Sequence, residues 1–218
     1  MSRYQLVIGN KNYSSWSMRP WIAMRHFGFD FEETVIQLDQ PATSRRIGRH
    51  SRAGRVPVLH DGKITVWESL AILEYLGEIN PRMWPRNRAA RAMARAAANE
   101  MHAGFAALRN SLPMNLRRVR RPLSTPLAAD VKADISRIEQ LWRDCREAHG
   151  KGGPFLFGRF TIADAMYAPV VTRFDTYAVD VGKATRAYMD AVAATKALTA
   201  WKQSALQESW IIHADEVA

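Results

Sequence analysis

Three serine hydroxyl groups gather near the start of the chain, at Ser14, Ser15 and Ser17. The apolar residues that follow recur at helical spacing up to Gly28, which places these hydroxyls at the beginning of a predicted helix. One serine is enough to cap a helix. Any further hydroxyl is free to donate a hydrogen bond to an anion, which the positive end of the helix dipole also attracts. The cluster therefore predicts a cap, an anion site or both.

A second candidate site is the stretch 55–76, which the sequence predicts to fold as strand, turn, strand and helix. Val56–Leu59 and Ile64–Trp67 are rich in β-branched residues, and Asp61-Gly62 between them is typical of a hairpin turn. The leucines and isoleucines that follow recur at helical spacing, with Ser69 as the expected N-cap.

Pro57 is unusual in a strand-like run because proline has no N–H to donate to a sheet ladder. A cis Val56–Pro57 bond would turn the chain and leave the backbone polar groups of Val56 available to a ligand. The helix predicted to begin at Ser69 offers free N–H groups and its positive dipole end to a carboxylate. An extended backbone beside a helix N-terminus can hold a short peptide that carries an acid group.

The stretch Val-Pro-Val-Leu, followed by Glu-Ser-x-Ala-Ile-x-x-Tyr-Leu, resembles the glutathione-binding half of cytosolic glutathione S-transferases. The Ser-Ser-x-Ser cluster is similar to that of the serine-type transferases, the zeta class in particular. The segment 100–109 looks like that of a bacterial subgroup. The resemblance implies that Ser14 stabilises the glutathione thiolate and that Ser15 and Ser17 support it. Tyr13 is the rival donor, because other transferases use a tyrosine.

The same resemblance implies a set of glutathione contacts. The backbone at Val56–Pro57 would pair with the cysteinyl part, and Glu68 would hold the γ-glutamyl ammonium. Ser69, with its N–H group, would hold the γ-glutamyl carboxylate. Two residues of suitable charge remain as alternatives for the glycyl carboxylate, His50 and Arg55.

By resemblance we expect a glutathione transferase that uses glutathione as cosubstrate, binds a hydrophobic electrophile between two domains and forms a homodimer. Trp16 stands where zeta members carry a cysteine, and Cys145, the single cysteine, falls on the apolar face of a predicted helix. This argues against cysteine-type chemistry. An isomerase of the maleylacetoacetate or maleylpyruvate kind is the close alternative, and a non-catalytic binding module is the second.

The expected architecture is an α/β N-terminal domain over residues 1–80, a linker over 81–87 and an all-α domain over 88–218. A thioredoxin-like arrangement of the first domain follows from the resemblance. Strands are expected at Tyr4–Ile8 and Phe31–Leu38, before a loop with a short helix. Beyond the linker, Thr161 and Asp164 have the spacing of a capping box. The other helices are expected at Ala89–Leu108, Leu127–Ala148, Gly182–Ala194 and Thr195–Leu206.

The composition of the 218 residues, 47% of them hydrophobic, is that of a globular protein. The net charge of +10 comes from arginines scattered along the chain, which favours an anionic small ligand over a specific nucleic-acid site. We expect no membrane span because no apolar run is long enough. We expect no metal site because a single cysteine cannot form a cysteine cluster and because the spacing of Glu100 and His102 would place them on different helix faces. A cytoplasmic protein is the simplest interpretation.

Overall fold

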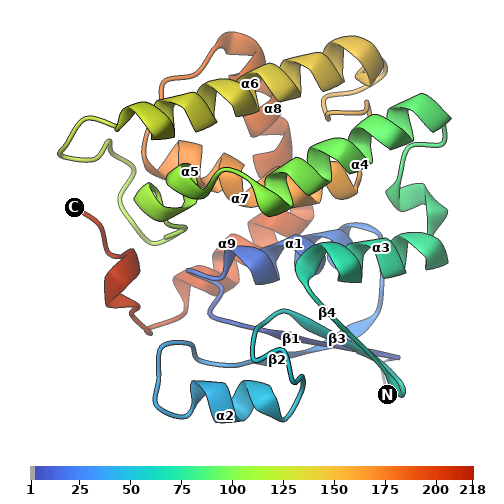
Figure 1. Ribbon diagram of the computed structural model, residues 1–218, viewed down its shortest axis with the longest axis vertical. Coiled ribbons are helices and arrows are strands. Elements are labelled where there is room, and N and C mark those ends of the chain that lie inside the picture. The colour runs from blue at the N-terminus through green and yellow to red at the C-terminus, as the bar shows by residue number, and fades with distance from the viewer. Residues whose placement is uncertain (1–2) are drawn as a thin grey trace.

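The computed structural model describes residues 3–218 and places a four-stranded sheet against a set of helices (Figure 1). The strand order is β2-β1-β3-β4, with β1 and β2 parallel and the other pairs antiparallel. The parallel pair requires a crossover, and helix α1 supplies it. The strands are β1 Tyr4–Ile8, β2 Phe31–Val35, β3 Val58–Asp61 and β4 Ile64–Trp67.

Three helices accompany the sheet: α1 Ser15–His26, α2 Thr43–Gly48 and α3 Ser69–Ile79. Figure 1 shows α1 and α3 on the face of the sheet that meets the remaining helices, and α2 on the opposite face. Leu6, Ile22 and Leu73 are fully buried between the sheet and these helices. The predicted α/β domain is confirmed, as is the short helix in the loop after β2.

The predicted hairpin is confirmed, with Val58 paired to Trp67 and Asp61 to Ile64. Its first strand, however, runs over Val58–Asp61 and not over the predicted Val56–Leu59, because the cis bond before Pro57 keeps Val56 out of the ladder. The prediction that Ser69 caps the following helix is wrong by one residue. Glu68 is the cap residue, because its φ of 69° takes it out of the helical conformation, and Ser69 is the first residue of α3. Strand β2 ends at Val35, three residues before the predicted end.

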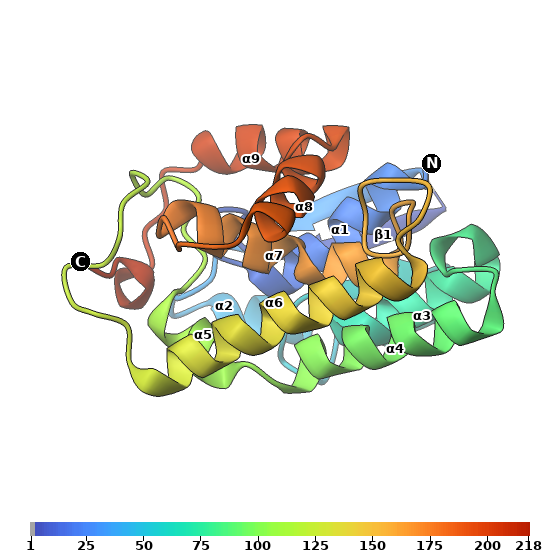
Figure 2. The ribbon, with the colours of Figure 1, turned by 90° about the horizontal axis from the view of Figure 1, so that it is seen from above.

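The rest of the chain forms a helical domain, which confirms the second half of the predicted fold. Helix α7 lies at its centre, is buried along nearly its whole length and packs against α1 and α4 (Figure 2). The predicted capping box opens this helix: Asp164 Oδ2 accepts hydrogen bonds from Thr161 N at 2.7 Å and Thr161 Oγ1 at 3.0 Å. The helices are α4 Arg88–Ala103, α5 Ala106–Ser111, α6 Ala129–His149, α7 Ile162–Thr176, α8 Lys183–Ala193 and α9 Lys196–Leu206.

The single helix predicted over Ala89–Leu108 is wrong, because the chain breaks at Gly104 and Phe105 into α4 and α5. Phe105 has a φ of 58°, in the left-handed region, which turns the chain between the two helices. Arg109 on α5 reaches back and donates Nη1–H to the Gly104 carbonyl. Apolar residues continue at helical spacing across this break, so periodicity alone could not find it.

The C-terminal tail returns to the sheet domain. The Glu208 carboxylate accepts hydrogen bonds from the backbone N–H groups of Lys11 and Asn12 at 2.7 and 3.0 Å. Trp201 Nε1 donates to the Lys11 carbonyl at 2.9 Å. These contacts fix the loop that precedes α1. Cys145 is buried in the core, as its place in the sequence predicted, and none of the described helices is long and apolar enough to cross a membrane.

Candidate functional site

The predicted hydroxyl cluster lies at the start of α1, where the helical domain meets the sheet domain. Ser14 is the N-cap residue and Ser15 is the first residue of the helix. The Ser14 hydroxyl donates to Ser17 Oγ at 2.8 Å, and Ser17 Oγ also accepts the Gly9 N–H at 3.1 Å. Ser17 is fully buried and lines none of the cavities at this interface. It therefore ties the end of β1 to α1, and the structure does not bring it into the site as a ligand contact.

Ser15 faces the helical domain and has a charged partner there. Arg173 on α7 donates Nη2–H to Ser15 Oγ at 3.2 Å and Nε–H to the Leu112 carbonyl at 2.8 Å. Among the described residues, Nη1 of this buried guanidinium has no hydrogen-bond partner. Burial lowers the pKa of Arg173 to about 10, so the group is charged at neutral pH.

Tyr13 lies beside the serines, but its hydroxyl is engaged by other groups. It donates to the Glu216 carboxylate at 2.5 Å and accepts a hydrogen bond from Arg117 Nη2 at 2.9 Å. Burial and the hydrogen bond to Glu216 raise the pKa of Tyr13. Its proton therefore points to the C-terminal tail.

The peptide bond between Val56 and Pro57 is cis, the isomer that leaves the Val56 backbone available to a ligand. Strand β3 begins only at Val58, so Val56 lies outside the sheet ladder. The N–H and C=O groups of Val56 have no hydrogen-bond partner within residues 3–218. An extended ligand backbone could pair with both groups.

Glu68 and Ser69 lie at the start of α3, across from the cis peptide. The Glu68 carboxylate is half-exposed and lies 3.9 Å from His102 Nε2 on α4. Burial is the main cause of a lowered pKa for His102, and Arg19 lowers it further. Ser69 is buried, and its hydroxyl has no partner in the part of the chain that the structure describes.

Two cavities join these elements at the boundary between the domains. The smaller, of about 370 Å³, is lined by Pro57, Trp67, Glu68 and His102 among others. The larger, of about 450 Å³, is lined by Tyr13, Ser14, Ser15, Arg173 and Asp215 together with the residues around Pro113. Both cavities are also lined by Trp16, Arg55, Val56 and Arg109. The two spaces therefore adjoin, and one extended ligand can reach from Glu68 to the serines.

The two residues expected as alternatives for binding the glycyl carboxylate, Arg55 and His50, line different cavities. Arg55 lines both interdomain cavities. His50 lines a neighbouring cavity with Arg49 and Arg52 and lies 5.7 Å, ring centre to ring centre, from His60. No group of three metal-ligating side chains occurs within residues 3–218.

Positive charge is concentrated behind the serines. Arg19 is fully buried, with its guanidinium 4.1 Å from the Trp16 ring centre, and Arg109 lies 5.6 Å from the same centre. The guanidinium nitrogens of Arg19 have no hydrogen-bond partner among the described residues. Burial and the nearby Arg173 lower the pKa of Arg19 to about 9. The stacking on Trp16 offsets part of the cost of burying this charge.

Sequence reasoning missed Arg19 and Arg173 as parts of the site. A signal existed for both, because each arginine interrupts an otherwise apolar helical run. A charged residue in such a run is rarely buried without a reason. The contact between Ser15 and Arg173, however, joins residues 158 positions apart and has no signature in the local sequence.

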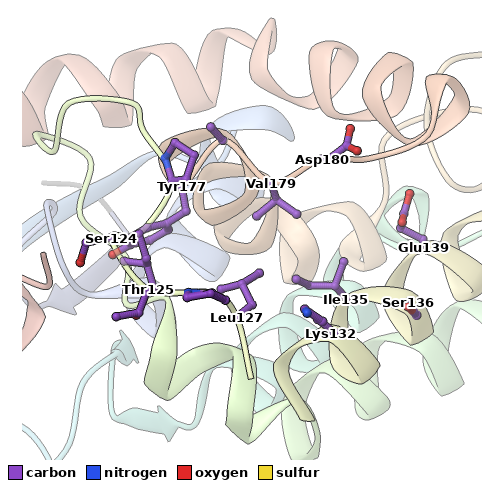
Figure 3. Close-up of a pocket in the computed structure, with 14 residues that line it drawn as sticks. Ser124, Thr125, Leu127, Lys132, Ile135, Ser136, Glu139, Tyr177, Val179 and Asp180 are labelled. Atoms are coloured by element: carbon purple, nitrogen blue, oxygen red, sulfur yellow. The ribbon is translucent and has the colours of Figure 1, made fainter. Parts of the chain in front are cut away.

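A larger cavity lies away from this interface. Its volume is about 640 Å³, and it is lined by the connecting segment 122–127, α6 and residues 177–180 (Figure 3). The Glu139 carboxylate at its edge already accepts hydrogen bonds from Gly182 N and Thr185 Oγ1. None of the described residues that line it carries a buried polar atom without a partner. The interdomain cavities are therefore the better candidate site.

Two family models match the chain. Residues 13–79 match the model described as "Glutathione S-transferase, N-terminal domain", and residues 89–201 match "Glutathione S-transferase, C-terminal domain". The two matches contain the start of α1, the hairpin, α3 and the helical domain, and so include both sides of the interdomain cavities.

Comparison with individual proteins also gives relatives, both by sequence and by fold. Maleylacetoacetate isomerase of Rattus norvegicus is 30% identical over 174 residues, which are 77% of each chain. Dichloromethane dehalogenase of Methylorubrum extorquens is 44% identical over 50 residues, and this match spans 22% of our chain and 17% of the relative. A glutathione transferase homologue from Burkholderia gl BGR1, solved with bound glutathione, is 22% identical, with a TM-score of 0.70 over 92% of this chain and 97% of that one. The two domain matches and the isomerase relative together show that this chain belongs to the glutathione S-transferase family.

Proposed function

We propose that the protein is a glutathione transferase of the serine type, in which a hydroxyl of the Ser14–Ser15 pair donates a hydrogen bond to the glutathione thiolate. One observation carries the proposal. The serines, the unpaired backbone of Val56 and the carboxylate of Glu68 line two adjoining cavities between the domains. Glutathione is a tripeptide with one ammonium group and two carboxylates. The unpaired backbone of Val56, the carboxylate of Glu68 and the guanidinium of Arg55 suit these groups.

The contacts of glutathione follow from these positions. The Val56 backbone pairs with the cysteinyl residue, and Glu68 binds the γ-glutamyl ammonium. The N–H groups at the start of α3, beginning with Ser69, bind the γ-glutamyl carboxylate. Arg55 binds the glycyl carboxylate. The thiol then lies near the start of α1.

The chemistry requires a thiolate. A free thiol has a pKa of about 8.5 and is mostly protonated at neutral pH. A serine hydrogen bond and the dipole of α1 both favour the anion. The thiolate attacks an electrophilic carbon in the larger cavity, a carbon–sulfur bond forms, and the leaving group departs with its electron pair. The serine does not become covalently attached.

Conjugation with a panel of hydrophobic electrophiles, followed by mass spectrometry, tests this proposal. The double variant Ser14→Ala/Ser15→Ala should lose on the order of a hundredfold in kcat because the donors to the developing charge are gone. Tyr13→Phe should keep most of the activity, since the Tyr13 hydroxyl is bound to Glu216 and Arg117. Loss of activity in Tyr13→Phe with retention in the double variant would contradict the serine assignment.

A second candidate is a glutathione-dependent isomerase acting on an acidic substrate. Three arginines, Arg55, Arg109 and Arg173, line the larger cavity, whereas Asp215 is the carboxyl group among its lining residues. The isomerase relative from Rattus norvegicus adds support. Isomerisation regenerates glutathione and conjugation consumes it. A substrate that is converted completely with a trace of glutathione would therefore favour the isomerase. Binding of glutathione without either reaction would favour a non-catalytic module.

A further inference from the structure

The charge of Arg173 is costly to bury where it lies. Its guanidinium is buried beneath the start of α1, and within residues 3–218 it forms no ion pair. Beyond the effect of burial, the charge of Arg109 lowers the pKa of Arg173, and Arg173 in turn lowers the pKa of Arg19. Burying cations together without an anion is unfavourable. An anion in the adjoining cavity would relieve this cost.

The carboxylate of Asp215 is the internal candidate for that anion. It lines the same cavity as Arg173, but the two side chains form no described hydrogen bond or ion pair. Burial raises the pKa of Asp215, although the charge of Arg173 acts in the opposite direction, and Nη1 of Arg173 still has no hydrogen-bond partner among the described residues. The guanidinium therefore retains capacity for an anion from outside the chain.

Ser14 and Ser15 differ in whether their hydroxyl protons are available to an anion in the cavity. A serine hydroxyl has one proton and can accept two hydrogen bonds. Ser15 Oγ accepts from Arg173 Nη2, and its own proton has no acceptor among the described residues. The Ser14 proton, in contrast, is directed to Ser17 Oγ. Of the two serines, Ser15 is thus the one whose proton is available to the cavity.

We propose that Arg173 is a positioning residue that makes Ser15, rather than Ser14, the donor to the bound thiolate. This inference rests on the proposed function. Because the guanidinium occupies one lone pair of Ser15 Oγ, the hydroxyl proton turns toward the cavity. The thiol of glutathione loses its proton to water, and Ser15 keeps its own proton and shares it with the sulfur. The buried charge of Arg173, with Arg19 and Arg109 behind it, favours the anion through this hydroxyl.

The test is the thiol pKa of bound glutathione, measured from the ultraviolet absorbance of the thiolate as a function of pH. Ser15→Ala should raise this pKa by about one unit, a tenfold loss of thiolate at neutral pH. Arg173→Lys should raise it by a smaller amount, because lysine keeps the charge but loses the forked donor. Ser14→Ala should leave it nearly unchanged.

Two controls separate positioning from general damage to the fold. If Arg173 acts through Ser15, adding Arg173→Lys to Ser15→Ala should produce no further change in the thiol pKa. Arg118→Lys is the matched control, because Arg118 also has guanidinium nitrogens that are buried without a partner but lines no described cavity. It should not move the thiol pKa. Circular dichroism establishes that each variant is folded, and Ser15→Ala keeps the test valid if Arg173→Lys does not fold.

The outcomes are distinct. A raised thiol pKa in Ser14→Ala, with none in Ser15→Ala, would overturn the inference and leave the proposed function intact. Independent, additive effects of Ser15→Ala and Arg173→Lys would overturn the positioning role of Arg173. Failure of the unmodified protein to bind glutathione would overturn the proposed function and this inference with it.

Discussion

Glu68 combines a costly backbone conformation with a partly exposed charge. Its φ of 69° is rare outside glycine and costs on the order of 1 kcal/mol or more. Its carboxylate has His102 as a neighbour at 3.9 Å, and burial and Arg19 lower the pKa of that histidine against the opposing effect of Glu68. A carboxylate held in this way, at the edge of a cavity, is suited to bind a cation from a ligand.

The first prediction concerns that carboxylate. Glu68→Gln keeps the size of the side chain and removes its charge, so it should weaken glutathione binding by about tenfold, or ~1.4 kcal/mol. The control is Glu78→Gln on the same helix, where the side chain is exposed and lines no described cavity. Calorimetric titration gives the affinity and thermal unfolding reports the fold. Equal affinity in Glu68→Gln and Glu78→Gln would refute the assigned role of Glu68.

Single residues also show where sequence reasoning reaches its limit. Pro57 and Val56 were identified because a proline in a strand-like run is incompatible with a regular ladder, and that constraint is local. Ser14 and Ser15 were found together by their spacing, but which of them has a free proton depends on Ser17 and Arg173. Such a choice is made by tertiary contacts and cannot be read from the cluster itself.

At the scale of elements, α7 connects the two domains and depends on its capping box. The Asp164 carboxylate is fully buried and accepts three hydrogen bonds, from Leu156 N, Thr161 N and Thr161 Oγ1. The helix carries Arg173 two turns further on, beneath the start of α1. The cap therefore holds in place an element that contributes to the site.

The second prediction is that Asp164→Ala lowers the free energy of unfolding by about 3 kcal/mol, because three buried donors lose their acceptor. Asp190→Ala, an exposed aspartate on α8, should cost less than ~0.5 kcal/mol. Urea unfolding measures both. A similar, small loss in the two variants would mean that the capping box does not stabilise the fold.

A dependence on pH follows as the third prediction. Burial raises the pKa of Asp164 to about 6, above its value in the unfolded chain. The folded protein therefore binds the proton more readily, and the part of the stability that comes from this pKa shift is fully present below about pH 4 and lost as the pH rises through 6. Unfolding free energies of the unmodified protein and Asp164→Ala should differ more at pH 4 than at pH 7. A difference that grows with pH would contradict this sign.

The elements were predictable where local chemistry is decisive. The hairpin of β3 and β4 and the Thr161–Asp164 cap agree with the sequence because turn and cap residues act within a few positions. The break between α4 and α5 was missed because it depends on Phe105 adopting a left-handed conformation, which is unusual for a bulky side chain. The contact of Glu208 with the loop before α1 joins residues far apart in the chain, so the local sequence could not predict it.

At the scale of the whole molecule, the sheet leaves apolar side chains uncovered at one edge. Strand β4 is the last strand in the order β2-β1-β3-β4, and Ile64 and Trp67 on it are 49% and 50% exposed. Exposed apolar residues on an edge strand are typical of a surface that another chain covers. The homodimer expected from the family resemblance would bury them.

The fourth prediction is that the protein sediments as a dimer at micromolar concentration. Ile64→Lys should shift it toward the monomer, because a charge would then have to be buried at the contact. Val119→Lys, at a site 77% exposed in the connecting segment, should leave the sedimentation unchanged. A monomer in the unmodified protein, or equal behaviour of both variants, would exclude this edge as the dimer contact.

The most direct test of the whole account is calorimetric titration of the unmodified protein with glutathione and, in parallel, with S-hexylglutathione. We expect both to bind in the micromolar to low-millimolar range, and the hexyl compound to bind more tightly because its chain enters the larger cavity beside Met114. Absence of binding by both compounds would contradict the assignment of a glutathione site between the domains and, with it, the proposed thiol chemistry.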